Sequence, residues 1–315
     1  MSDGSQLIHL LNIYKWTLLT TPLLALALAL VGMHLMARGQ SLQTLVVSQG
    51  SSLGVLLGIA LNVLWHSHGA GHDYGHDSTH GHGHASLGYS SELESGLWPL
   101  LFGLIVAGLS YLWSEKLRWR QNPSLAPASL LMAFALLMAL SHVTASLSPH
   151  LETHMSAIYF GDLATLSDRE ALSAGLLSFL SLGALFYWRR LWLRQSFNLA
   201  VLGPSQTPSW SFTLLALLLI SLSIQYLGLL FTLGGLFIAP SLLARRQDLT
   251  HQGYQLRLTL ATLLGSTSGF LASLLWPTLP TAPAVVLGLA VASEFFRITS
   301  RWATPRSSAM TKNTV

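Results

Sequence analysis

The chain has 315 residues and no cysteine, and only 9% of its residues are charged, whereas soluble domains carry about 25%. The absence of cysteine excludes disulfide bonds, thiolate metal ligands and a cysteine nucleophile. The G-x-x-x-x-G-K-[ST], G-x-S-x-G and H-E-x-x-H motifs are also absent, which excludes an ATP-binding P-loop and gives no sign of a serine-hydrolase or zinc-protease site. So little charge cannot cover a water-exposed surface, but it is sufficient for a surface that faces lipid.

The sequence consists largely of long charge-free runs. A helix of about 20 apolar residues crosses the roughly 30 Å hydrocarbon core of a bilayer. The sequence therefore predicts an all-α, polytopic integral membrane protein with a single transmembrane domain of about nine spans (eight to nine). The predicted spans are Trp16–Ala37, Leu42–Trp65, Ser95–Trp113, Leu125–Ser148, Ala171–Trp188, Ser209–Ser223, Leu227–Ala244, Leu258–Trp276 and Ala282–Phe296.

The number of spans depends on one weak break. The charge-free run from Gln195 to Ala244 is too long for one helix, and Gly203, Pro204 and Pro208 end its first part. A second, weaker break near Gln225-Tyr226 separates nine spans from eight.

Lysine and arginine are distributed unevenly between the two sides that nine spans create. One side holds 14 of the 16 basic residues, and the other keeps only Lys15 and Arg169. Because basic loops face the cytoplasm, we expect the N-terminus outside, the C-terminus inside, and a disordered cytoplasmic tail over residues 299–315. The residues on the basic side are Arg38, Lys116, Arg118, Arg120, Arg189, Arg190, Arg194, Arg245, Arg246, Arg257, Arg297, Arg301, Arg306 and Lys312.

A histidine-rich loop, residues 66–94, is predicted on the outer side. Seven of the 13 histidines fall within residues 66–84, interleaved with glycine and two aspartates. Imidazole is the commonest protein ligand for borderline divalent metals, and the glycines favour weak, multiple and exchangeable binding over one rigid site. A solvated linker, or a loop that responds to pH, stays open as the alternative. The predicted ligands are His66, His68, His72, Asp73, His76, Asp77, His80, His82 and His84.

Three further histidines lie in or beside the fourth predicted span. His142 lies inside it, where an ionisable group is costly and points to a function. His150 and His154 have the i, i+4 spacing that places both on one face if the segment is helical. These three complete the predicted metal ligands; the alternative is that they are ordinary interfacial polar residues.

Several short motifs follow one another along the second half of the chain. They are Ile158–Leu163 (IYFGDL), Tyr226–Leu230 (YLGLL), Leu236–Ser241 (LFIAPS) followed by Ala244–Arg246 (ARR), and Leu279–Val286 (LPTAPAVV). With these motifs the second half, from Met155 to Ile298, resembles the membrane permeases of the bacterial zinc/manganese/iron ABC importers, whose Y-L-F-G-D-L is similar to IYFGDL. Ser52–Gly58 resembles the family more weakly, and where the first half of the family carries G-D-x-L-x-H, this chain has Thr44, Leu45 and Gln49.

The resemblance implies the permease subunit of an ATP-driven divalent metal importer in the bacterial inner membrane. Two permease chains would form the pathway, separate cytoplasmic ATPase subunits would drive it, and a periplasmic metal-binding protein would deliver the ion. The chain itself would not be an enzyme, would hold no tight cofactor and would bind lipid but no nucleic acid. Ala244, Arg245 and Arg246 would couple it to the ATPase. Zinc is the favoured cargo, because the outer loop is rich in imidazole and free of thiols.

Two other functions stay open on the sequence. One is a secondary metal transporter, although those families place paired histidines and carboxylates inside their spans, and here the spans contain only His34 and His142. The other is a membrane-anchored metal sensor or chaperone whose outer loop is the working part.

Overall fold

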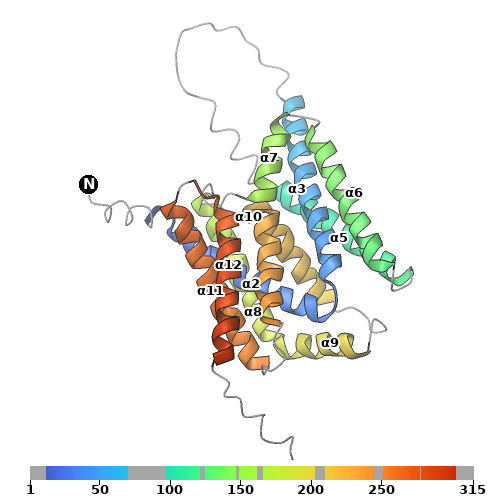
Figure 1. The fold of residues 1–315 in the computed structure, drawn as a ribbon. Coiled ribbons are helices and arrows are strands. Elements are labelled where there is room, and N and C mark those ends of the chain that lie inside the picture. Colours follow the sequence, from blue (N-terminus) through green and yellow to red (C-terminus); the bar gives the residue numbers. More distant parts are fainter. Residues whose placement is uncertain are drawn as a thin grey trace, which may run out of the picture.

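The computed structural model describes residues 12–69, 97–120, 125–146, 149–161, 166–202, 210–244, 251–276 and 278–302. These residues form an all-helical bundle (Figure 1), and eight of their helices are long and apolar enough to cross a membrane. This confirms the predicted polytopic all-α membrane fold. The helices are α2 (Lys15–Ala37), α3 (Ser41–Gly69), α5 (Leu97–Arg120), α6 (Ala126–Ser146), α7 (Pro149–Phe160), α8 (Asp168–Tyr187), α9 (Arg189–Leu202), α10 (Trp210–Ala244), α11 (His251–Leu275) and α12 (Thr281–Trp302).

Helix α10 folds back on itself and contains two of the predicted spans. Gly228 interrupts it with non-helical angles, φ 83° and ψ 166°. Thr232 Oγ1 donates a hydrogen bond of 2.8 Å to Ser223 Oγ, nine residues earlier. Because nine residues of continuous helix would separate them by about 13 Å, the chain must turn at Gly228. The two arms give nine apolar segments within the described residues.

The predicted break was therefore right, and its position is Gly228 rather than Gln225-Tyr226. A positive φ is strained for any residue with a Cβ, so the turn forms at Gly228, the glycine nearest to the predicted break.

Helix α2 lies at the centre, packed against α8, α10 and α11. Its residues from Leu24 to Val31 are buried on all sides. Gly32 lets α10 approach closely: a Cβ on Gly32 would lie 1.8 Å from the carbonyl oxygen of Leu236. A second pair, α3 and α5, packs through α3 glycines, since a Cβ on Gly54 would lie 2.3 Å from the carbonyl oxygen of Phe102.

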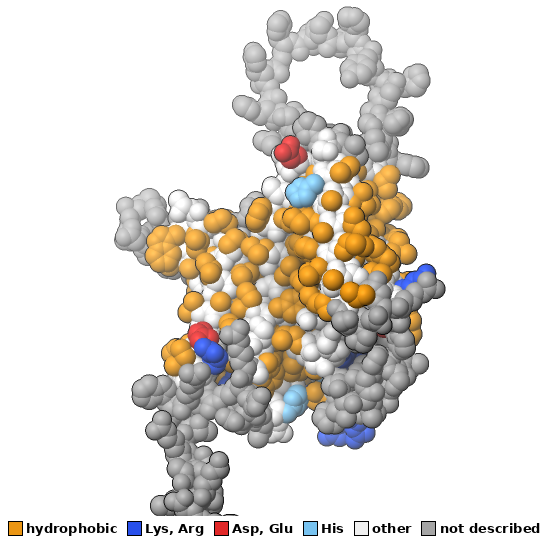
Figure 2. All heavy atoms as spheres, turned by 45° about the vertical axis from the view of Figure 1, so that its right-hand side comes forward, with side chains coloured by type: hydrophobic (Ala, Val, Ile, Leu, Met, Phe, Trp, Pro, Cys, Tyr) orange, Lys and Arg blue, Asp and Glu red, His pale blue; other side chains and the backbone are white. Residues whose placement is uncertain are grey.

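Two shorter helices lie at opposite ends of the bundle. Helix α7 stands at the end where α3 finishes and α5 begins, above α10, and α9 lies across the other end (Figure 1). The prediction treated both segments as connections between spans. Hydrophobic side chains dominate the visible surface between these ends (Figure 2), as contact with lipid requires.

The loop and tail boundaries shift slightly. Helix α3 continues to Gly69, into the start of the predicted 66–94 loop, and α12 continues to Trp302, into the predicted tail. The rest of both segments lies outside the described residues.

Candidate functional site

Gln49 is the centre of a neutral polar group inside the bundle. Its side chain is fully buried on α3. The amide Nε2 donates to Ser141 Oγ on α6, at 3.2 Å, and to the hydroxyl of Tyr159 on α7. Its Oε1 is buried and has no hydrogen-bond partner within the described residues. Three helices thus meet around an amide oxygen that is free to accept a ligand.

Buried hydroxyls continue this group along α3 and α10. Ser51 Oγ donates to Ser221 Oγ at 3.0 Å, and Ser48 Oγ is buried without a partner in the described part of the chain. None of these three side chains is exposed. Buried polar groups in an apolar bundle are costly, so a row of them along α3 indicates a function. Amide and hydroxyl oxygens can replace water around a cation without the tight hold of a carboxylate or imidazole.

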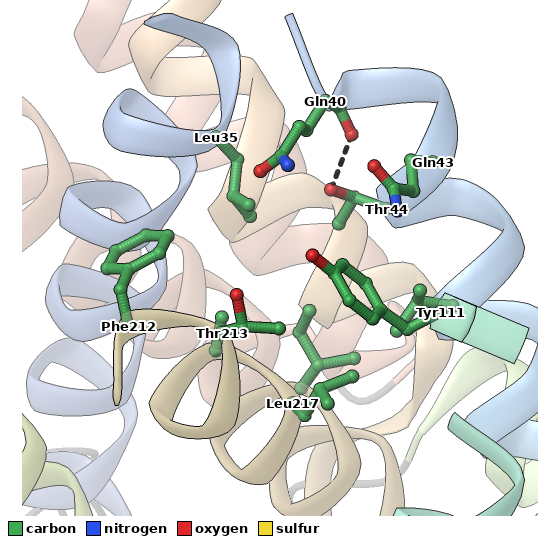
Figure 3. A pocket seen from close by; sticks show the side chains of 11 residues that line it. Leu35, Gln40, Gln43, Thr44, Tyr111, Phe212, Thr213 and Leu217 are labelled. Atoms are coloured by element: carbon green, nitrogen blue, oxygen red, sulfur yellow. Dashed lines mark hydrogen bonds between the residues drawn. The ribbon is translucent and has the colours of Figure 1, made fainter. Parts of the chain in front are cut away.

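A small cavity of about 20 Å³ lies towards the end that carries α9. Figure 3 shows Tyr111 of α5 and Thr213 of α10 pointing towards the space below Gln40 and Thr44. Thr44 Oγ1 donates to the Gln40 carbonyl at 2.8 Å. The cavity has room for about one water molecule. Leu45, in contrast, is partly exposed and does not line this cavity.

Arg38, at the end of α2, contacts Ser196 of α9 and Phe212 of α10 beside this cavity. Its side chain is only 5% exposed. Its Nε donates to Ser196 Oγ at 3.0 Å, and the guanidinium lies 4.0 Å from the ring centroid of Phe212. Burial lowers the pKa of Arg38 to about 10, so it remains a cation at neutral pH. His34 Nδ1 lies 3.1 Å from the same serine oxygen.

A larger cavity, of about 140 Å³, lies at the end that carries α7. We call it the outer cavity. Its polar lining consists of His154 of α7, Glu170 of α8, and Gln225 and Tyr226 of α10. Ala157 and Ile158 of α7 also line it, and the next residue, Tyr159, contacts Gln49. Helix α7 therefore separates the outer cavity from the buried polar group.

The predicted metal ligands are distributed as follows. His154 lines the outer cavity, and His142 is exposed on α6 with its ring centroid 6.2 Å from that of Tyr159. Helix α7 carries both His150 and His154, as the i, i+4 spacing required. No group of three or more histidines and carboxylates suited to a metal occurs in the described ranges. His66 and His68 lie in the last turns of α3 and His150 in the first turn of α7, and their side chains are not described; His72, Asp73, His76, Asp77, His80, His82 and His84 lie outside the described residues.

Ala244 is the last residue of α10, and Arg245 and Arg246 lie outside the described residues. The residues of the site that the sequence prediction missed include Ser141, Glu170, Gln225 and the buried serines of α3 and α10. A polar residue within an apolar stretch is the signal that could have identified Ser141 and Gln225.

Residues 84–298 match the ABC 3 transport family, which is more than half of the chain, and the chain therefore belongs to that family. The match begins at residue 84 and leaves out α2 and α3, in line with the weaker resemblance of the first half. No curated protein matches the chain. Among solved structures, PsaBC from Streptococcus pneumoniae in complex with Fab is similar, with a TM-score of 0.65 and 14% identity over 93% of this chain and 94% of that one. At that identity the likeness shows the fold.

The fold and the family define the chain as a multi-pass membrane permease of the ABC 3 metal-importer family. It is a transport subunit, and ATP hydrolysis belongs to a separate chain in such transporters. Permeases of this family work together with an ATPase and a binding protein. The predicted resemblance is confirmed, and it excludes the sensor and secondary-transporter alternatives as descriptions of the whole chain.

Proposed function

We propose that the chain imports a divalent metal ion, zinc in the first place, across the bacterial inner membrane. One observation carries the proposal: Gln49 and the buried α3 serines lie on the same helix as Thr44 of the small cavity, and Gln49 contacts Tyr159, the residue after the outer-cavity residue Ile158. This row of oxygens crosses a bundle whose other interior side chains are mostly apolar.

The neutral character of the row fits passage rather than storage. A carboxylate or imidazole deep in the bundle would hold a divalent ion tightly. Gln49 Oε1 and the serine hydroxyls offer oxygen ligands without charge. In this proposal the direction of ion movement is set by ATP-driven rearrangement of the helices. It does not depend on a tight binding site in the middle of the bundle.

The choice of zinc, and the role of the histidine run, come from the sequence. Seven imidazoles and two carboxylates within residues 66–84, with no thiol, favour zinc among the borderline metals. In our proposal this run captures or buffers the ion outside the membrane and raises its concentration beside the outer cavity.

The proposed assembly is a permease homodimer with the basic side in the cytoplasm. The N-terminus lies outside and the C-terminus inside. Ala244, Arg245 and Arg246 contact the ATPase, and a periplasmic metal-binding protein docks at the α7 end.

Growth and uptake of radioactive zinc under zinc limitation test this function in cells that lack the chain. Uptake should fall and should return with a plasmid copy. Competition by excess manganese or iron measures the preference. Unchanged zinc uptake, with manganese or iron uptake lost instead, would replace zinc by that metal; unchanged uptake of all three metals would refute the proposal.

A further inference from the structure

The outer cavity contains a set of metal-binding atoms from three helices. His154 comes from the middle of α7, Glu170 from the first turn of α8, and Gln225 from the first arm of α10, close to its turn. These residues are far apart in the sequence, so only the fold brings them to one cavity. Ile59 near the end of the apolar part of α3 and Pro99 at the start of α5 also line it, which places it at the α7 end of the bundle.

One polar atom in the lining of this cavity, the side-chain oxygen of Gln225, has no hydrogen-bond partner among the described residues. This oxygen, Oε1, is buried. Buried carbonyl oxygens are almost always satisfied, and an exception calls for a water molecule or an ion. The cavity volume of about 140 Å³ is large enough for either, together with further water.

Glu170 is held in place for such a role. Its Oε2 accepts a hydrogen bond from the backbone nitrogen of Ser167, at 3.0 Å, and its own backbone nitrogen donates to Ser167 Oγ, at 3.3 Å; these two bonds form the capping box of α8. Ser167 Oγ also donates to Oε2, at 2.8 Å. Every hydrogen bond between Ser167 and the Glu170 carboxylate is accepted by Oε2. The carboxylate is thus fixed at a helix end that lines the cavity, and its Oε1 takes no part in the capping box.

The chemistry of these atoms selects the type of ligand. One imidazole nitrogen, one carboxylate oxygen and one amide oxygen form a mixed nitrogen and oxygen set, which suits borderline divalent ions such as Zn²⁺, Mn²⁺ and Fe²⁺. Calcium and magnesium prefer sites made only of oxygen, usually with more carboxylates. With a single negative charge, and water completing the shell, the site would release the ion readily.

We infer that the outer cavity is a divalent-cation site at which His154, Glu170 and Gln225 hold the ion before it passes α7 to Gln49. The inference rests on the proposed function, and it assigns Glu170 and Gln225 a role that neither the sequence motifs nor the family match gives them. The link inward is Tyr159, which follows the cavity-lining Ile158 and contacts Gln49.

Zinc titration of the purified full-length chain in detergent tests this site, without the ATPase and without transport. The histidine run must first be silenced, so every protein carries His66→Asn, His68→Asn, His72→Asn, His76→Asn, His80→Asn, His82→Asn and His84→Asn. His154→Asn and Glu170→Gln are then added singly to this background. Glutamine at position 170 keeps the capping box, so α8 remains intact. Asp168→Asn is the matched control, because Asp168 is an exposed carboxylate in the same helical turn and does not line the cavity.

The background protein should bind one zinc ion per chain at this site. His154→Asn and Glu170→Gln each remove a direct ligand and should weaken zinc binding by at least about 10- to 100-fold, the loss typical of a residue that only supports a metal ligand. Asp168→Asn should leave zinc binding unchanged. If His154→Asn fails to fold, Gln225→Leu removes the amide oxygen and must weaken zinc binding as well.

Three results would overturn the site: no zinc binding by the background protein, binding unaffected by His154→Asn and Glu170→Gln, or an equal loss in Asp168→Asn. The proposed function fails separately. A chain that binds zinc here but carries none into vesicles keeps the site and loses the function, and a chain that transports zinc without binding it here does the reverse.

Discussion

Gly161 and Gly228 touch backbone to backbone, at the point where the end of α7 meets the turn of α10. A Cβ on Gly228 would lie 2.6 Å from the backbone nitrogen of Gly161, and a Cβ on Gly161 would lie 2.0 Å from the carbonyl oxygen of Leu227. Both glycines have positive φ, 69° and 83°. Gly161 belongs to the Ile158–Leu163 segment and Gly228 to the Tyr226–Leu230 segment, so two of the segments that resemble the importer family contact each other in the fold. This contact places Ile158 at the outer cavity and Tyr159 at Gln49.

Gly161→Ala and Gly228→Ala should each destabilise the protein strongly. Each substitution adds strain at a positive φ, about 1–3 kcal/mol, to a steric overlap that costs a similar amount. A loss of 2 kcal/mol lowers the Tm by roughly 3 °C in a chain of 315 residues. Thermal unfolding of the purified variants in detergent measures this.

Two other glycines provide controls for this prediction. A Cβ on Gly108 or Gly39 meets nothing within 4 Å, and Gly39 alone of the two has a positive φ, 66°. Gly108→Ala should be neutral or slightly stabilising, and Gly39→Ala should show the strain of about 1–2 kcal/mol by itself. Equal Tm values for Gly161→Ala and Gly108→Ala would show that the close approach of α7 to α10 is wrong.

Tyr159→Phe should destabilise the protein and slow transport. Removal of the hydroxyl leaves one N–H of the buried Gln49 amide without its acceptor, which costs about 1–3 kcal/mol. Tyr187→Phe is the control, since Tyr187 is 82% exposed and should change stability by less than about 0.5 kcal/mol.

A double-mutant cycle checks the same pair. Combined with Gln49→Leu, Tyr159→Phe should cost less than it does alone, with a coupling of at least about 0.5 kcal/mol. Additive losses would mean that the two side chains do not interact.

Arg38→Lys should be more harmful than Arg38→Met. The flat guanidinium both stacks on Phe212 and donates to Ser196, and an ammonium cannot do both. Methionine fills similar space without burying a charge, so it avoids the desolvation that lysine keeps. Chemical unfolding of both variants at pH 7 should rank lysine below methionine; the reverse order would contradict the stacked, buried arrangement.

The pH dependence of this residue follows from its lowered pKa of about 10. The folded state then gives up the proton of Arg38 before the unfolded state does, so the contribution of Arg38 to stability rises with pH only above about 10. Arg38→Met should therefore leave the slope of Tm against pH unchanged between pH 6 and pH 8. A changed slope in that range would show that Arg38 is coupled to a group that titrates there.

Replacement of the seven histidines of residues 66–84 by asparagine should weaken zinc uptake only when zinc is scarce. If the run captures and buffers the ion, the half-saturating zinc concentration rises while the maximal rate stays the same. Uptake measured over a range of zinc concentrations separates these two quantities. Loss of uptake at every concentration would make the run an essential site rather than a buffer.

Most of the fold could be predicted from local patterns in the sequence. Charge-free runs bounded by arginine and proline located the spans, because the length of a helix that crosses a bilayer is fixed by its thickness. The weak break in the longest run was visible as well, although only the backbone requirement at Gly228 set its position. Helix α9 escaped prediction because its arginines indicated a connecting loop, whereas the burial of Trp192 and Ser196 against α2 and α10 makes it a packed helix.

The site depended on contacts that no local pattern contains. Gln49, Ser141 and Tyr159 come from three helices, and their meeting results from the packing of α3, α6 and α7. His154 was predicted from its spacing to His150, whereas Gln225 was predicted only as part of a weak break between spans and no local pattern gave Glu170 a role in a site. Only the turn of α10 brings Gln225 opposite the start of α8.

The most direct test of the whole account is zinc uptake into vesicles that contain the chain, its cognate ATPase and its binding protein, compared with the same vesicles carrying Gln49→Leu. We predict that zinc accumulates only when hydrolysable ATP is supplied to the ATPase, and that Gln49→Leu abolishes most of this accumulation. Accumulation without ATP, or accumulation that Gln49→Leu leaves intact, would contradict an ATP-driven pathway through the buried polar group.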